Sequence, residues 1–128
     1  MQDGKHVILC IDDDDDVLFF LQTVLEAKDY KVLTAGTAEE GLRLFKATTP
    51  DFLIVDLMME EVDAGTRLVK ELRLLGNTAP IYMLSSVGDN LSMTADYTSL
   101  GLSGVLQKPV DEQQLLAILN AKLGGYSG

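Results

Sequence analysis

Five consecutive aspartates, residues 12–16, lie between two apolar runs, residues 7–11 and 17–20. Two carboxylates about 4 Å apart repel each other by roughly 4 kcal/mol at an effective dielectric constant near 20. Such crowding costs stability unless a positive charge lies among the acids. The run therefore predicts a positively charged partner, such as a bound cation.

Three further polar residues stand at the ends of apolar segments. Asp56 ends the segment FLIVD, Ser85 follows IYML, and Lys108 follows VLQ. If these segments are parallel strands, their carboxyl ends meet at one edge of a sheet, where functional residues gather. Carboxylates are ligands that Mg²⁺ prefers. We expect Asp12 and Asp13 to hold such an ion at this edge.

The elements that position these residues follow from the hydrophobic pattern. Short runs that are apolar on both faces alternate with longer stretches of helical period, which is typical of parallel strands covered on both sides. Strands are expected at residues 7–11, 30–35, 52–55, 81–84 and 104–106. Helices are expected around residues 17–25, from 37 onward, and at 64–75, 89–100 and 111–123. Strict alternation predicts an α/β fold, a doubly wound five-stranded parallel sheet with helices on both faces.

Capping residues support these helices. The aspartates at 14–16 are expected to cap the first helix and to interact with its positive N-terminal end. Thr37 and Glu40 have the spacing of a capping box, and Asp111 begins a related sequence. Phe19 and Phe20, within the first helix, are expected in the core.

Length and composition narrow the class of protein. The 128 residues suffice for one domain with a single core, and 10 Lys plus Arg against 20 Asp plus Glu give a net charge of −10. We therefore expect no direct binding to nucleic acid or to anionic membranes. No apolar run approaches the ~20 residues of a membrane span, and no secretory signal opens the sequence. The single cysteine, Cys10, suits the cytoplasm and is expected to be a buried core residue.

Taken together, these motifs resemble the receiver domain of two-component response regulators, a CheY-like (βα)5 domain with a flavodoxin-like fold. The resemblance runs from Val7 to Leu123, so residues 1–123 are expected to form the receiver domain and residues 124–128 a flexible tail or the start of a linker. The features that carry it are the paired acids Asp12 and Asp13, the segment Asp56-Leu-Met-Met59, the segment Leu84-Ser85-Ser86, and Lys108-Pro109.

The resemblance implies a chemistry for these residues. Asp56 would accept a phosphoryl group from a phosphohistidine of a sensor histidine kinase or a His-phosphotransfer protein. The protein would not be an enzyme beyond catalysing its own phosphorylation and dephosphorylation. Mg²⁺ would be held by Asp12, Asp13, Asp56 and the backbone carbonyl of Met58. The phosphoryl oxygens would be bound by Lys108, by the Ser85 hydroxyl and by the Ser86 backbone N–H.

The resemblance also implies a route from phosphorylation to output. The phosphorylated Asp56 would draw in Ser85 and its loop, shifting a two-state equilibrium at a protein-binding face. By analogy with the family, residues 89–100, 104–106 and 111–123 would form that face, which would meet a downstream protein target or a second copy in a homodimer.

Two departures from the family pattern bear on this mechanism. Glu60-Glu61 stands where most receivers have Pro-Gly or Pro-Asn, and Val105 stands where the family has Tyr or Phe. A degenerate pseudo-receiver, held in one state, is therefore one alternative. Haloacid dehalogenase-type phosphatases, which also use an Asp nucleophile with Mg²⁺, are another, although they normally need a longer chain.

Overall fold

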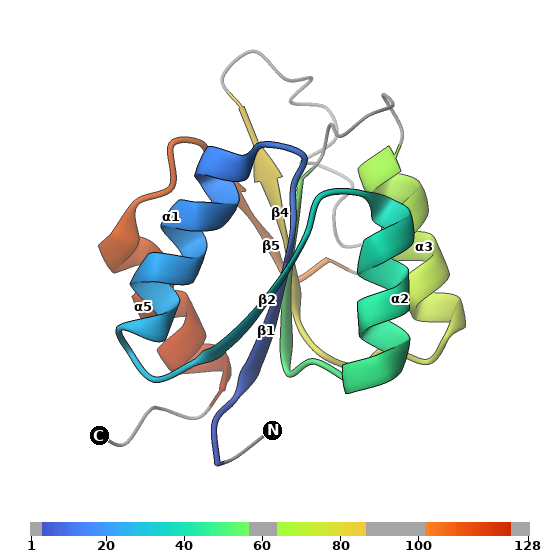
Figure 1. Ribbon diagram of the computed structural model, residues 1–128, viewed down its shortest axis with the longest axis horizontal. Coiled ribbons are helices and arrows are strands. Elements are labelled where there is room, and N and C mark those ends of the chain that lie inside the picture. The colour runs from blue at the N-terminus through green and yellow to red at the C-terminus, as the bar shows by residue number, and fades with distance from the viewer. Residues whose placement is uncertain (1–3, 57–63, 87–101, 124–128) are drawn as a thin grey trace.

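The computed structural model describes residues 4–56, 64–86 and 102–123. They form one parallel sheet of five strands in the order β2-β1-β3-β4-β5, with helices on both faces (Figure 1). In chain order, the elements are β1 Val7–Ile11, α1 Asp15–Glu26, β2 Lys31–Ala35, α2 Ala38–Thr48, β3 Phe52–Asp56, α3 Ala64–Leu74, β4 Ile81–Ser85, β5 Gly104–Gln107 and α5 Glu112–Lys122. The predicted doubly wound α/β fold is confirmed. The helix expected at residues 89–100 lies outside the described residues.

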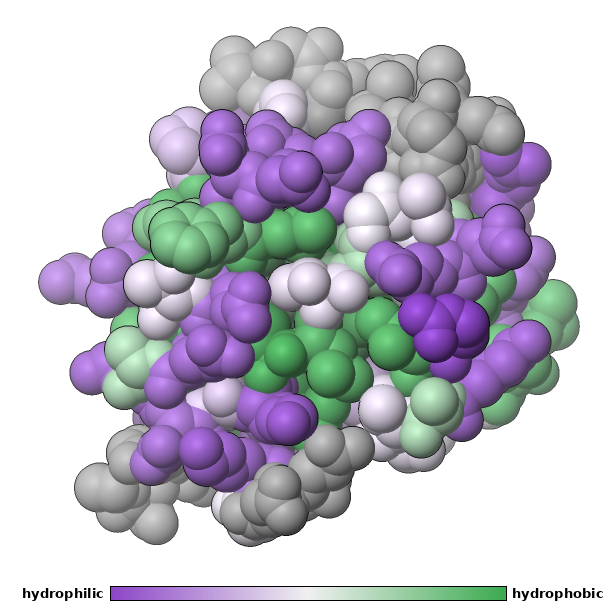
Figure 2. Space-filling view, viewed as in Figure 1, coloured by the Kyte–Doolittle hydropathy of each residue, from purple (hydrophilic) through white to green (hydrophobic). Residues whose placement is uncertain are grey.

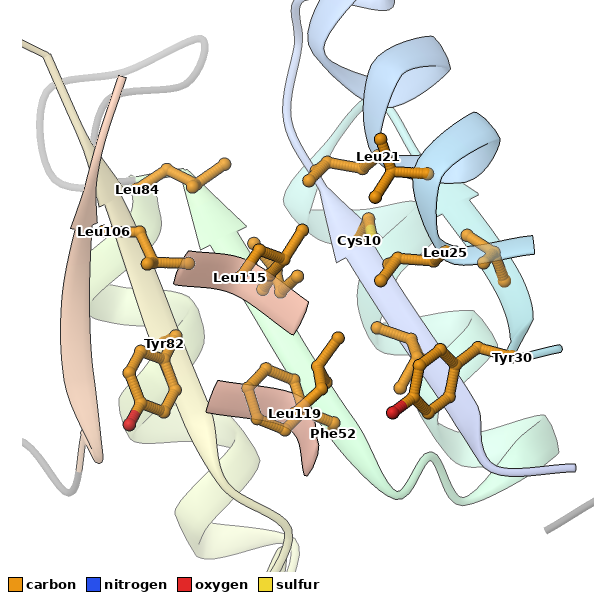
Figure 3. Packing of buried hydrophobic residues seen from close by; sticks show 14 of the residues in the cluster. Cys10, Leu21, Leu25, Tyr30, Phe52, Tyr82, Leu84, Leu106, Leu115 and Leu119 are labelled. Atoms are coloured by element: carbon orange, nitrogen blue, oxygen red, sulfur yellow. The ribbon is translucent and has the colours of Figure 1, made fainter. Parts of the chain in front are cut away.

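The sheet separates two hydrophobic cores. Helices α1 and α5 cover one face, and α2 and α3 cover the other (Figure 1). Successive strand residues point to opposite faces, so Ile8 and Cys10 of β1 join the core under α1 and α5, whereas Leu9 and Ile11 join the core under α2 and α3. Figure 3 shows the first of these cores, where Cys10 lies near the leucines of α1. Strands buried on both faces explain the nearly continuous apolar runs in the sequence.

Cys10 is fully buried, as its position in the first apolar run predicts. Burial raises the pKa of its thiol to about 12, and the negative charge of Asp12 adds to the effect. The thiolate is the reactive form of cysteine, so this residue serves packing rather than chemistry.

The helix N-termini follow the predicted pattern in two of three cases. The Asp14 side chain accepts a hydrogen bond from the Asp16 N–H at 2.9 Å and caps α1. The Thr37 hydroxyl accepts from the Glu40 N–H at 3.1 Å and caps α2. Asp111 is the N-cap residue of α5, which confirms the predicted start of this helix, but its side chain does not make the capping hydrogen bond that the sequence predicts.

The expectation that Phe19 and Phe20 lie in the core is also wrong. Phe19 is 71% exposed and Phe20 is 36% exposed. Leu18, Leu21 and Leu25 are buried and define the inward side of α1. With 3.6 residues per turn, positions 19 and 20 are rotated away from that side and face outward.

Gly104 of β5 provides a test of this packing, because a Cβ atom added there would lie 2.5 Å from Cε2 of Tyr82. The Tyr82 ring is stacked on Phe52, with ring centroids 5.4 Å apart, which leaves it little room to retreat. We expect Gly104→Ala to lower the free energy of unfolding by about 1–3 kcal/mol, the usual cost of overpacking. Gly36→Ala is the matched control, since nothing lies within 4 Å of its added Cβ. Urea denaturation measures both, and equal stabilities of the two variants would contradict the packing described here.

Candidate functional site

The polar residues singled out in the sequence come together at the carboxyl edge of the sheet. Asp12 directly follows β1, Asp56 ends β3, Ser85 ends β4, and Lys108 directly follows β5. Strand order reverses between β1 and β3, so Asp12 and Asp56 flank the topological switch point where open α/β sheets bind ligands.

Lys108 links the two buried acids of this edge. Its Nζ atom lies 2.9 Å from Asp12 Oδ2 and 3.2 Å from Asp56 Oδ1. The side chains of Asp12 and Asp56 are 0% and 5% exposed, and that of Lys108 is 19% exposed. The Lys108 backbone N–H also donates to the Ser85 carbonyl at 2.7 Å, which anchors the lysine beside the end of β4. Lys108, which follows β5, thus supplies part of the positive charge that the aspartate run requires.

The charges at this edge perturb the ionisation of the lysine. Burial by itself lowers the pKa of the Lys108 ammonium. The contact with Asp12 and the charge of Asp56 outweigh burial and raise its pKa above the ordinary value of 10.5. Lys108 is therefore a cation at every physiological pH.

The Asp12 carboxylate is held with one oxygen turned toward the site. Asp12 Oδ1 accepts a hydrogen bond from the Asp14 N–H at 2.9 Å. Asp12 Oδ2 is buried and accepts no hydrogen bond of good geometry from the described residues, although the Lys108 ammonium lies beside it. The Lys108 ammonium offsets part of the cost of burying this oxygen, and a metal cation at the same edge would offset more of it.

Asp12, Asp13 and Asp56 lie close enough together to hold one metal ion. Each offers one carboxylate oxygen, and the three oxygens lie within 4.8 Å of one another. Three carboxylates against one lysine leave two excess negative charges at this edge. Hard oxygen ligands with an excess of two negative charges suit Mg²⁺, which is commonly bound by one or two carboxylates together with water and phosphate oxygens.

Of the remaining predicted site residues, some are described by the structure and others lie outside the described part. Ser85 is buried at the end of β4, and the neighbouring Ser86 is exposed. Val105, which stands where the family has an aromatic residue, is half-buried on β5 and pairs with Met83 of β4. Met58 and the Glu60-Glu61 pair lie outside the described residues.

Sequence reasoning missed an apolar groove beside Lys108. The groove has a volume of about 190 Å³ and lies between the start of α1 and the chain after β5. Phe20 and the half-buried Val17 lie three positions apart on α1 and could have signalled apolar side chains beside the site. The groove is lined by Asp16, Val17, Phe20, Lys108, Pro109 and Val110. A larger hollow of about 790 Å³ involves the loops that follow α2 and α3 and contains none of the site residues.

The fold and this edge define a class of protein. Residues 8–120 match the family of the response regulator receiver domain, so the chain belongs to that family. The resemblance inferred from the sequence motifs is confirmed. Receiver domains act in phosphorylation-dependent signalling in two-component systems, where they work with histidine kinases and effector domains.

Individual relatives support the same assignment. The chain is 34% identical over 119 residues to the ycf27 protein of Guillardia theta, covering 93% of this chain and 46% of ycf27. It is 30% identical over 116 residues to the alkaline phosphatase synthesis transcriptional regulatory protein PhoP of Bacillus subtilis, covering 91% of this chain and 48% of PhoP. The chain thus spans about half the length of these curated relatives.

Two solved receiver domains match over nearly their full length. A CheY-like receiver domain protein from Methanospirillum hungatei superposes with a TM-score of 0.86 at 26% identity, covering 94% of this chain and 95% of that one. A receiver domain protein from Clostridium thermocellum gives a TM-score of 0.84 at 29% identity, covering 93% and 94%. Within the described part of the chain, no helix is long and apolar enough to span a membrane.

Proposed function

We propose that Asp56 accepts a phosphoryl group from a phosphohistidine of a sensor histidine kinase or His-phosphotransfer protein, with Mg²⁺ as cofactor. The observation that carries the proposal is the position of Lys108, whose ammonium lies between the buried carboxylates of Asp12 and Asp56. A nucleophilic carboxylate beside a fixed cation is the arrangement that phosphoryl transfer needs, because this chemistry depends on positioning and electrostatic stabilisation.

In the proposed reaction, a carboxylate oxygen of Asp56 attacks phosphorus. The phosphorus–nitrogen bond of the donor histidine breaks, its electrons return to the imidazole, and an acyl phosphate forms on Asp56. Lys108 then binds one phosphoryl oxygen, and the Ser85 hydroxyl and the Ser86 N–H donate to others. Mg²⁺, held by Asp12, Asp13, Asp56 and the Met58 carbonyl, would neutralise charge on the phosphoryl group.

The experiment that tests this proposal needs no knowledge of the partner kinase. The protein is incubated with Mg²⁺ and acetyl phosphate, and the modified residue is located by mass spectrometry. A gain of one phosphoryl group on Asp56 supports the receiver function. No gain, together with no response to beryllofluoride, would favour a pseudo-receiver, the alternative that Val105 and Glu60-Glu61 suggest. Turnover of phosphate esters would favour a haloacid dehalogenase-type phosphatase.

Magnesium binding makes a separate prediction about stability. An ion that binds only the folded state at a hundred times its Kd stabilises the protein by about 2.7 kcal/mol. We expect Mg²⁺ to raise the melting temperature of the wild-type protein, and we expect Asp12→Asn to abolish most of this rise. Asp111→Asn is the control because it removes one exposed acid outside the site. Equal Mg²⁺ effects on all three proteins, measured by differential scanning calorimetry, would rule out Asp12 as a ligand.

The wider context of the domain is part of the proposal. We propose that residues 1–123 form the receiver and residues 124–128 a tail or linker start, that the protein is cytoplasmic, and that this domain does not itself bind nucleic acid. Phosphorylation switches the face formed by residues 89–100, 104–106 and 111–123, of which residues 89–100 lie outside the described part. That face then binds a downstream protein or a second copy of the chain.

A further inference from the structure

The outward side of α1 is acidic with an exposed aromatic ring at its centre. Phe19 is 71% exposed, and Asp15 and Asp16 precede it by about one helical turn. Glu26 follows two turns later on the same side, and α1 contains no basic residue. Figure 2 shows hydrophobic side chains at the surface over α1, next to a band of hydrophilic residues.

The outward side of α3 is the opposite in charge and also carries an exposed apolar side chain. Leu74 is 86% exposed, and it follows Arg67 and Lys70 at the i, i+3, i+7 spacing of one helix face. Arg73 is its exposed neighbour, and Glu71 is the one acid of the helix. Three cations against one acid give α3 a net charge of +2 in a chain whose net charge is −10.

These two surfaces lie on opposite sides of the molecule. Helix α1 covers one face of the sheet and α3 covers the other, so their outward sides point in opposite directions (Figure 1). Neither surface can therefore cover the other within one chain. Each surface has an exposed apolar side chain at its centre. The charged residues around the two centres are opposite in sign.

We propose that the outward side of α1 in one copy of the chain binds the outward side of α3 in a second copy. Contacts between two α1 helices, or between two α3 helices, would bring like charges together. The association is consequently head-to-tail, and such heterologous contacts build open chains or rings rather than closed two-fold dimers. A contact between two single helices is small, so the association is weak and is seen at high protein concentration.

The proposal is tested by sedimentation velocity over a wide range of protein concentrations, without Mg²⁺ or a phosphoryl donor. It is thus independent of the proposed phosphorylation. We expect the weight-average sedimentation coefficient of the wild type to rise with concentration. Phe19→Ser and Leu74→Ser should each abolish the rise while preserving the circular dichroism spectrum, because both side chains are exposed. Ala47→Ser, at an exposed position of α2, is the control and should associate like the wild type.

Mixing the variants distinguishes this contact from general stickiness. An equimolar mixture of Phe19→Ser and Leu74→Ser retains one intact α1 side and one intact α3 side, so it should form dimers and nothing larger. Charge reversal gives a second check. Asp15→Lys and Lys70→Glu should each weaken association at least about tenfold, and the double variant should recover it at the wild-type net charge. A wild type that stays monomeric at all concentrations, a monomeric mixture, or no recovery would each overturn the proposal.

Discussion

Asp56→Asn is expected to gain no phosphoryl group when incubated with Mg²⁺ and acetyl phosphate. The amide of asparagine has almost the shape of the carboxylate, but it lacks the negative oxygen that attacks phosphorus. It also removes one of the two carboxylates that contact Lys108, at 3.2 Å from Nζ. Intact-protein mass spectrometry should show full modification of the wild type and none above background in the variant.

The control for this experiment is Asp111→Asn. It makes the same change of charge at an exposed residue that precedes α5 and makes no capping hydrogen bond through its side chain. This variant should be modified at the wild-type rate. A phosphoryl group found on Asp12 or Asp13 in the Asp56→Asn protein would show that the nucleophile has been assigned to the wrong carboxylate.

Replacing Lys108 with methionine is expected to destabilise the protein in EDTA by about 1–3 kcal/mol, because two buried carboxylates lose their cation. Methionine keeps much of the length of the side chain and removes the charge. Added Mg²⁺ should recover much of the loss, since a divalent ion among Asp12, Asp13 and Asp56 replaces the missing charge. The gain in the free energy of unfolding on adding Mg²⁺, measured by urea denaturation, should therefore be larger in the variant than in the wild type.

The pH dependence of this ion pair has a definite direction. Asp12 and Asp56 raise the pKa of Lys108 above 10.5. The ion pair therefore stabilises the folded state at neutral pH, and this stabilisation is lost only as pH rises through the raised pKa. Lys28→Met, at an exposed position that follows α1, is the control and should change stability little in either buffer. If Lys108→Met were as stable as Lys28→Met in EDTA, the ion pairs of Lys108 with Asp12 and Asp56 would make no net contribution to stability.

The fold could be predicted because its signals are local. Residues 7–11 and 52–55 are apolar at every position, which is typical of strands buried on both faces, and each is followed by a helical pattern. The edge at which the site forms also follows from the sequence, since polar residues that end parallel strands must meet at the carboxyl edge. Asp56, Ser85 and Lys108 were found by this reasoning, and the structure places all three at that edge.

Errors arose where one residue had to be assigned to a side of a helix. Phe19 and Phe20 are hydrophobic, and hydrophobicity alone favours burial. The buried leucines of α1 pack against the sheet and so fix the rotation of the helix about its axis. Both phenylalanine rings then face outward. The side chain of Asp111 shows the same limit, because residue type predicts where a helix begins but not whether the capping hydrogen bond forms.

The sequence by itself determined the order of strands and helices along the chain, the acids at the ends of the first and third strands, and the net charge of −10. Only the tertiary structure decided that Lys108 lies within 3.2 Å of both Asp12 and Asp56, and that Asp12 turns one oxygen toward the Asp14 N–H. The reason is physical. Hydrophobic periodicity is set by neighbours in the chain, whereas contacts between distant residues depend on how the strands pack side by side into one sheet.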